Sequence, residues 1–306
     1  MKVAIIGIGS VGSAVATAVK NTGLFNEIVL FDRDGARARA AAEDLGHASA
    51  FERDIKITDV SNYRGIRGSD IVVIAAGANQ KPGQPRSELV KTNASVISDV
   101  IPKVMQNVDK NKIKIVIVTN PLDAMVILAQ KLSGLPSERV IGTGTMLDSA
   151  RLRTILSRHL CVSPQSINAY VLGEHGDSSV INWSSITIGS VALNDFCRQV
   201  KMPISASAKK TIEHRVHAAA YEIIQGRGAT WDGIAAAVAD LLRTIINNEN
   251  RIVTVSCVSK NVALSLPRIV GECGCVATLM PQMSKAESEQ LQTSISAIRA
   301  NYKLIK

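Results

Sequence analysis

Aromatic side chains are scarce in this sequence. Only 3% of its 306 residues are Phe, Trp or Tyr. Proteins that bind single-stranded nucleic acid stack the bases on aromatic side chains, so this scarcity argues against that class. The formal net charge is +9, and phosphate contacts need only Lys and Arg. The charge therefore leaves phosphate-bearing ligands open, while we expect no nucleic-acid partner.

Cysteines are few and show no regular spacing. The chain has five, an odd number at scattered positions: Cys161, Cys197, Cys257, Cys273 and Cys275. A single residue separates Cys273 from Cys275, whereas zinc-binding cysteines are usually two to four residues apart. We therefore expect reduced thiols and no metal site.

Long apolar runs are the third absence. No stretch approaches the roughly 18 apolar residues that a membrane helix needs. The apolar run at residues 1–7 is too short for a signal peptide and lacks a cleavage-like site. We expect a cytoplasmic protein without a membrane partner.

The first half alternates short apolar runs with helical stretches. Residues 3–6, 27–31, 70–75 and 114–118 are almost continuously apolar, which is typical of parallel strands covered on both faces. Helical patterns at 13–21, 36–47 and 87–107 lie between them. This order predicts an α/β fold with a doubly wound parallel sheet.

The pattern changes after about residue 142. Helices are expected at 148–159, 205–225, 230–247 and 285–303, and strands at 166–172, 185–188, 251–258 and 263–270. We therefore predict two domains, a nucleotide-binding domain at residues 1–142 and an α+β substrate domain at residues 143–306.

A glycine-rich motif, Gly7-Ile8-Gly9-Ser10-Val11-Gly12, follows the first predicted strand and opens a helix. In that context the glycines allow a tight turn, a close approach of pyrophosphate and close helix–strand packing. Asp32 stands 20 residues after Gly12, where a carboxylate accepts the ribose hydroxyls and repels a 2′-phosphate. The motif predicts NAD as the cofactor, and Arg33 beside Asp32 leaves some tolerance of NADP open.

A second cluster, Gly173-Glu174-His175-Gly176-Asp177, places a histidine between glycines at a predicted strand end. An imidazole exchanges protons near neutral pH, so His175 is the candidate general acid and base. Asp148 is its expected orienting partner. Arg151 is three residues further along the same predicted helix, and its planar fork suits a carboxylate.

Two loops follow predicted strands. Residues 76–86 are rich in Gly and Pro and end in Arg86, so they form either a closing lid or an ordinary exposed loop. Asn120, in Thr119-Asn120-Pro121-Leu122-Asp123, is expected at the same sheet edge, with its amide near a substrate oxygen.

These motifs, in this order and over nearly the whole chain, resemble the NAD-dependent L-2-hydroxyacid dehydrogenases, the lactate/malate dehydrogenase family. The resemblance implies a Rossmann-type sheet followed by an α+β substrate domain. It implies that His175 exchanges a proton with the substrate C2 oxygen, that Asp148 orients it, and that Arg151 binds the substrate carboxylate. Arg86 would polarise the carbonyl as the loop closes, and Asn120 would assist near the reacting centre.

The resemblance also implies cofactor contacts and a homo-oligomer, tetramer or dimer. The implied cofactor-binding residues are Gly7, Gly9, Val11, Gly12, Asp32, Tyr63, Gly77, Ala78, Asn120 and Ile234. Tyr63 would lie on the adenine side and Ile234 against the nicotinamide ring.

The substrate prediction depends on Gln80. Malate-type members have an arginine there for a second carboxylate, which a neutral glutamine would leave unpaired. Gln80 thus favours a monocarboxylic 2-oxo acid, and Ala78-Asn79-Gln80-Lys81-Pro82-Gly83 resembles bacterial L-lactate dehydrogenases, with Thr230 lining the pocket. The main prediction is interconversion of pyruvate and L-lactate.

Alternatives stay open. Asn-Pro-Leu-Asp at 120–123 also suits malate-type members, and Trp231-Asp232 beside Thr230 could change the size or polarity of the pocket. Arg153 matches an arginine that binds fructose 1,6-bisphosphate in allosteric relatives, whereas Asn168 replaces their histidine, which argues against such activation and leaves room for a broader, hydroxyisocaproate-like 2-hydroxycarboxylate dehydrogenase. A catalytically silent NAD-binding sensor is the alternative from another class.

Overall fold

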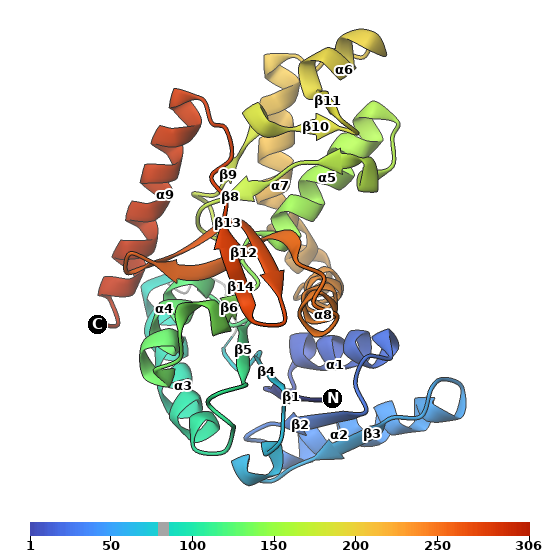
Figure 1. Cartoon of the computed structure of the whole chain (residues 1–306), viewed down its shortest axis with the longest axis vertical. Helices are drawn as coiled ribbons and strands as arrows, with labels where there is room; N and C mark the ends of the chain where they lie inside the picture. The colour runs from blue at the N-terminus through green and yellow to red at the C-terminus, as the bar shows by residue number, and fades with distance from the viewer. Residues whose placement is uncertain (79–85) are drawn as a thin grey trace.

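A nine-stranded sheet forms the centre of the computed structural model, which describes residues 1–78 and 86–306, and only the backbone of Arg86. The strand order is β14-β13-β12-β6-β5-β4-β1-β2-β3 (Figure 1). The six neighbouring strands β6, β5, β4, β1, β2 and β3 are parallel to one another. Their bounds are β1 (Lys2–Ile6), β2 (Glu27–Phe31), β3 (Lys56–Asp59), β4 (Ile71–Ile74), β5 (Lys114–Ile117) and β6 (Val140–Gly142).

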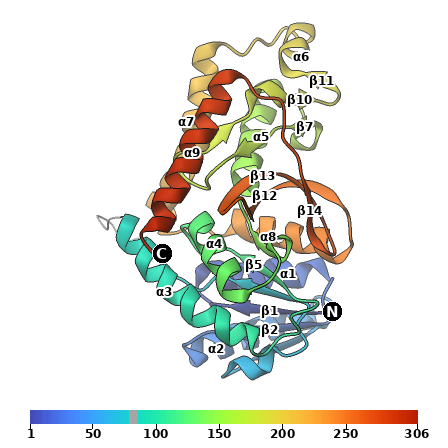
Figure 2. The same ribbon diagram turned by 60° about the vertical axis from the view of Figure 1, so that its left-hand side comes forward.

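Both faces of the parallel sheet are buried, because alternate side chains of each strand enter opposite cores. In β1, Val3 and Ile5 enter one core, while Ala4 and Ile6 enter the other. The first core is covered by α1 (Ser10–Thr22), α2 (Gly35–His47) and α8 (Asp232–Ile246), and the second by α3 (Arg86–Met105) and α4 (Leu122–Ser133) (Figures 1 and 2). The predicted doubly wound α/β fold is confirmed.

The second half of the chain extends this sheet. The antiparallel strands β12 (Arg251–Ser259), β13 (Val262–Gly271) and β14 (Gly274–Thr278) join it through the pair Ser256–Gly142. Strand pairing therefore continues across the domain boundary expected at residue 142. The division into two domains at this residue stays a prediction.

The remaining elements form a further layer around their own core. This layer holds two small sheets and three helices: β7 (Ile167–Asn168), β10 (Thr187–Ile188), β11 (Val191–Ala192), β8 (Val171–Leu172), β9 (Val180–Ile181), α5 (Met146–Leu160), α6 (Leu193–Gln199) and α7 (Ala206–Arg227). The C-terminal helix α9 (Lys285–Lys303) runs beside this layer and down to α4 (Figure 2). Short 3₁₀ turns lie at η1 (Ala48–Ala50), η2 (Tyr63–Ile66), η3 (Ser137–Arg139), η4 (Pro164–Ser166) and η5 (Trp183–Ser185).

Two predicted strands differ from the structure. The run 166–172 divides into β7 and β8, because β7 pairs with β10 while β8 pairs with β9. The run 185–188 begins in the 3₁₀ turn η5, and only Thr187–Ile188 is strand. An apolar run predicts burial, but it does not say which sheet a segment joins.

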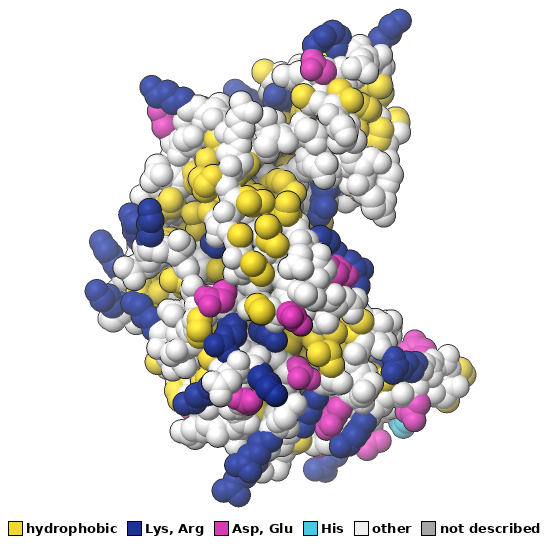
Figure 3. Space-filling model, viewed as in Figure 1, with side chains coloured by type: hydrophobic (Ala, Val, Ile, Leu, Met, Phe, Trp, Pro, Cys, Tyr) yellow, Lys and Arg dark blue, Asp and Glu magenta, His cyan; other side chains and the backbone are white. Residues whose placement is uncertain are grey.

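Charged side chains of both signs are scattered over the surface. In the view of Figure 3, Lys and Arg are interspersed with Asp and Glu rather than gathered in one basic patch. Within residues 1–78 and 86–306, no helix is long and apolar enough to cross a membrane.

Candidate active site

The glycine-rich turn joins β1 to α1 and leaves room for a ligand. Gly7 has a φ of +92°, and a Cβ on Gly12 would lie 1.8 Å from the Gly7 carbonyl oxygen, so the turn needs both glycines. A Cβ on Gly9, in contrast, would meet no described atom within 4 Å. Gly9 is also the N-cap of α1 and offers no side-chain cap, so the first amides of the helix face this open space. Such a helix end fits the pyrophosphate of a dinucleotide.

Asp32 lies beside this turn, just after β2. Its Oδ2 accepts the Ile8 N–H at 2.7 Å and its Oδ1 accepts the Asp34 N–H at 2.9 Å. A carboxylate has about four acceptor sites, so it can still accept ribose hydroxyls. Val11 and Ile234 are half-buried against the core on the α1–α8 side, which puts apolar side chains from α1 and α8 on one core. Arg33 is exposed.

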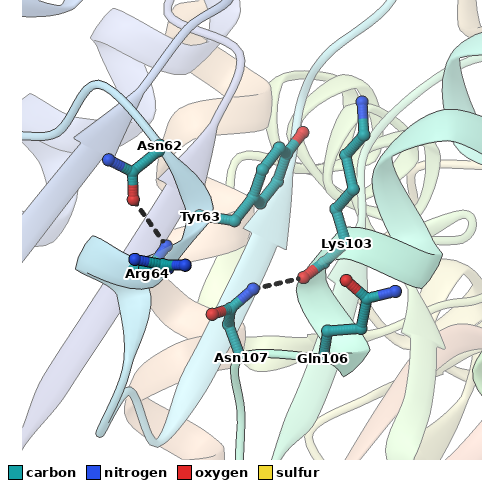
Figure 4. A pocket seen from close by; sticks show the side chains of 6 residues that line it. All are labelled: Asn62, Tyr63, Arg64, Lys103, Gln106 and Asn107. Atoms are coloured by element: carbon teal, nitrogen blue, oxygen red, sulfur yellow. Dashed lines mark hydrogen bonds between the residues drawn. The ribbon is translucent and has the colours of Figure 1, made fainter.

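Tyr63 lies in η2 and packs on Phe31, the residue before Asp32, with ring centroids 4.4 Å apart. Burial, helped by the charge of Asp99, raises the pKa of Tyr63 to about 12, so its hydroxyl stays protonated. It borders a polar pocket of about 330 Å³, lined by Asn62, Tyr63, Arg64, Lys103, Gln106 and Asn107 (Figure 4). The adenine-side role of Tyr63 stays a prediction.

The side chains of a histidine, an aspartate and an arginine form a hydrogen-bonded network. Nδ1 of His175 lies 2.7 Å from Oδ2 of Asp148, and Nη1 of Arg151 donates to Oδ1 of Asp148 at 2.9 Å. Asp148 and Arg151 come from the first turns of α5, as their spacing predicts. His175 follows β8 through Gly173, where a Cβ would lie 2.4 Å from Ser294 Oγ, so only glycine lets the chain pass there.

The electrostatics of this hydrogen-bonded network favour a protonated His175 beside an ionised Asp148. Burial alone lowers the pKa of His175, but the charge and hydrogen bond of Asp148 outweigh it and raise the pKa above its usual value. Burial likewise opposes ionisation of Asp148, but His175 and Arg151 hold its pKa below the usual range. Asp148 is therefore a carboxylate that stabilises the imidazolium. The His175 side chain keeps 24% of its surface exposed, so the ring is still accessible to a ligand.

Asp123 binds the backbone of His175, a role that the sequence analysis did not assign. Its Oδ2 accepts the backbone N–H of His175 at 2.8 Å and its Oδ1 accepts the Ser256 hydroxyl at 2.6 Å. Burial raises its pKa to about 6. The signal was a carboxylate in the otherwise apolar start of a helix, since a buried charge needs such partners.

Asn93 ties two predicted site segments together, and it was also missed. Its Oδ1 accepts the Ala78 N–H at 2.7 Å, and its Nδ2 donates to the carbonyls of Ala78 at 3.1 Å and Asn120 at 2.6 Å. A Cβ on Gly77 would lie 2.7 Å from Thr119 Cγ2, so this approach needs glycine. The signal was an amide in register with the buried apolar residues of α3.

Other predicted site residues are placed less directly. Thr230 is half-buried just before α8. A Cβ on Gly233 would lie 2.8 Å from Leu147 Cδ1, so α8 begins beside the first turn of α5, which carries Asp148. Asn120 is exposed at the sheet edge. Gln80 lies outside the described residues, as does the side chain of Arg86, whose backbone begins α3. Over the described ranges, no cluster of three His, Cys, Asp or Glu side chains is arranged to hold a metal.

Comparisons with known proteins agree with this geometry. Residues 1–142 match the model of the lactate/malate dehydrogenase NAD binding domain, and residues 145–306 match that of the alpha/beta C-terminal domain. The L-lactate dehydrogenase of Thermus aquaticus is 43% identical over 305 residues, covering 98% of this chain and 97% of that protein.

Solved structures give the same answer. A lactate dehydrogenase from a Medee basin deep-sea metagenome library superposes with a TM-score of 0.94 at 35% identity, over 99% of this chain and 98% of its own. The minor L-lactate dehydrogenase of Enterococcus mundtii, in a ligand-bound form, has a TM-score of 0.94 at 33% identity, over 100% and 98%. The predictions of an NAD-dependent enzyme and of its family are confirmed, and the chain belongs to the lactate/malate dehydrogenase family.

Proposed function

We propose that this chain is an NAD-dependent L-lactate dehydrogenase that interconverts pyruvate and L-lactate. The observation that carries the proposal is the contact of His175 with Asp148 and of Asp148 with Arg151. A proton carrier and a carboxylate-binding fork are thereby held together, which is the pair of groups that reduction of a 2-oxo acid requires. A silent sensor would have no use for this pair.

The proton transfer follows from the tautomer of His175. Because Nδ1–H donates to Asp148, Nε2 is the nitrogen that gives a proton to the substrate C2 oxygen during reduction and takes it back during oxidation. Gly7, Gly9, Gly12 and Asp32 would hold NADH, which would supply the hydride for C2 when bound.

Arg151 uses one nitrogen to bind Asp148 and has further N–H donors for the substrate carboxylate. Asn120, Thr230 and Arg86 complete the proposed site, with Arg86 polarising the C2 carbonyl. Val11, Tyr63, Gly77, Ala78 and Ile234 complete the proposed cofactor contacts. Asp123 and Asn93 are positioning residues, since they act on the backbone of His175, Ala78 and Asn120.

The pH dependence tests the role of Asp148. Since Asp148 raises the pKa of His175, the Asp148→Asn substitution should lower that pKa. Pyruvate reduction needs protonated His175, so its kcat/KM falls as the pH rises through this pKa, and in the variant the fall should come at lower pH. Lactate oxidation needs neutral His175, and its rise with pH should shift in the same direction. Steady-state pH profiles measure both, and an unmoved midpoint would contradict the proposed coupling.

Substrate preference tests the role of Gln80. We expect kcat/KM to be higher for pyruvate than for oxaloacetate, because a neutral Gln80 leaves the second carboxylate of oxaloacetate unpaired. The Gln80→Arg variant should raise the oxaloacetate-to-pyruvate ratio at least about 100-fold, since an ion pair in a closed site gives roughly 3 kcal/mol. Steady-state kinetics with NADH and NADPH on pyruvate, oxaloacetate and longer 2-oxo acids measure this.

Two outcomes would replace the proposal. Oxaloacetate preferred by the unmodified enzyme would make it a malate dehydrogenase. Longer 2-oxo acids preferred over pyruvate would make it a broader 2-hydroxycarboxylate dehydrogenase, in agreement with Trp231, whose ring stacks with Arg227 beside Thr230.

We further propose a cytoplasmic homo-oligomer, a tetramer or a dimer. Large apolar side chains stay exposed on the single chain, among them Tyr221 and Ile224 on α7. Symmetric association is the usual way such surfaces are covered.

A further inference from the structure

Two thiols outside the catalytic site touch each other. Sγ of Cys257 on β12 and Sγ of Cys275 on β14 are 2.7 Å apart. That is only about 0.7 Å longer than a disulfide bond. The other three cysteines are Cys161, Cys197 and Cys273, and all five are free thiols. The two sulfur atoms are therefore in position for a bond between them.

The fold brings these two strands together although β13 lies between them in the sheet. The register of β13 with β14 shifts between Ile269 and Val270, and Val270 is the partner of Cys275. Such a bulge bends a strand. Gly274 continues the bend, because its φ is +96° and a Cβ there would lie 2.0 Å from the Glu138 carbonyl oxygen. The contact is thus built into the sheet.

One thiol can be reached and the other is protected. Cys257 is 2% exposed, whereas Cys275 is half-buried. Both border a polar pocket of about 210 Å³ between β12, β14 and the turn η3. A small oxidant in this pocket would meet Cys275 first, with Cys257 directly behind it.

A buried arginine brings a positive charge to this pocket. Arg268 borders it and is only 4% exposed. Its guanidinium donates to the carbonyls of Cys257 and Leu264 and to the Thr278 hydroxyl, while its Nε–H has no partner. Among the described residues, no carboxylate lies within ion-pair distance of Arg268. Its positive charge favours a thiolate at Cys275.

The effects that raise the pKa of Cys275 outweigh the one that lowers it. The hydrogen bond with Cys257 and burial raise the pKa of Cys275 well above its usual value, and Glu138 adds to this, while Arg268 lowers it. The thiolate is the reacting form, so oxidation should be slow near pH 7 and faster as the pH rises. Once Cys275 has reacted, the neighbouring Cys257 is within reach to resolve the product.

We propose that Cys257 and Cys275 form a redox-active dithiol site that hydrogen peroxide converts into an intramolecular disulfide. The Cys275 thiolate attacks one peroxide oxygen, the O–O bond breaks, and a sulfenic acid and hydroxide form. Cys257 then attacks the sulfenic sulfur, the S–S bond forms, and a second hydroxide leaves. The two thiol protons convert both hydroxides to water, so the two sulfurs lose two electrons and the peroxide gains them.

The test uses the full-length, reduced protein with hydrogen peroxide at pH 8.5. After oxidation, free thiols are alkylated in denaturant and counted, and the cross-linked peptides are identified by mass spectrometry. We expect a Cys257–Cys275 linkage lighter by two hydrogens, restored by dithiothreitol, whether or not the exposed thiols of Cys161 and Cys273 also react. The linkage should also raise Tm by roughly 5 °C, because it closes a loop of about 20 residues in the unfolded chain.

Two serine variants separate this site from its neighbours. Cys257→Ser should abolish the linkage and the rise in Tm, leaving Cys275 as an over-oxidised sulfinic acid. Cys273→Ser is the matched control, since Cys273 is exposed two residues from Cys275, and it should leave the linkage intact. The proposal is overturned if five thiols survive the treatment, or if the linkage joins Cys273 instead. Neither outcome bears on the dehydrogenase activity, which can be measured in the same samples.

Discussion

Replacing His175 by Asn lowers kcat for pyruvate reduction by about 10³- to 10⁴-fold, the full effect of removing a positioned acid. The asparagine amide can still donate a hydrogen bond, but it has no proton to release at neutral pH. Its amide can also occupy the position of Nδ1 near Asp148, 2.7 Å away in the native protein, so the pocket should keep its shape. The loss should therefore appear in kcat, while NADH affinity, measured by fluorescence titration, stays the same.

The matched control is His159→Asn. His159 is exposed in the last turn of α5, the helix that carries Asp148 in its first turn, and it should tolerate the change without loss of rate. If His175→Asn retains more than about a tenth of the native kcat, another group supplies the proton and the proposed mechanism is wrong. A parallel loss of NADH binding would instead indicate that the substitution disturbs the fold.

Local sequence signals predicted most of the fold. The helix α9 has the bounds expected, 285–303, because Ser284 and Glu287 form a capping box at its start. The helix α4 was missed because almost every side chain in its first two turns is buried, which removes the helical periodicity. The place of β12–β14 in the main sheet could not be predicted either, since strand pairing between residues 142 and 256 leaves no local pattern.

The candidate site likewise has residues that the sequence predicted and residues that it did not. His175, Asp148 and Arg151 stood out because charged or titratable groups beside glycines, or at helical spacing, point to a shared cleft. Asp123 and Asn93 did not stand out, because each acts through the backbone of a residue far away in the chain, 52 residues for Asp123 and 15 for Asn93. A sequence pattern identifies candidate residues for a site, whereas the residues that position them appear only once the chain is folded.

Replacing Arg151 by Gln lowers kcat/KM for pyruvate by about 10²- to 10³-fold, mainly through a higher KM. In the proposed site the guanidinium would offer a charged fork to the substrate carboxylate, and a neutral amide would replace two charge-assisted hydrogen bonds with one weak one. Arg151→Lys keeps the charge but not the fork, so its loss should be intermediate. Arg158→Gln, an exposed arginine further along α5, is the control and should change nothing.

The pH profile of the Arg151→Gln variant adds a readout that a purely structural role would not produce. The charge of Arg151 lowers the pKa of His175, while Asp148 raises it. Removing Arg151 should therefore move the midpoint for pyruvate reduction to higher pH, opposite to the shift expected for Asp148→Asn. Shifts in the same direction, or an unchanged KM for pyruvate, would contradict the proposal. Opposite shifts would mean that the two groups act on one imidazole from opposite sides, so a single hydrogen-bonded chain sets both the proton affinity and the carboxylate affinity of the site.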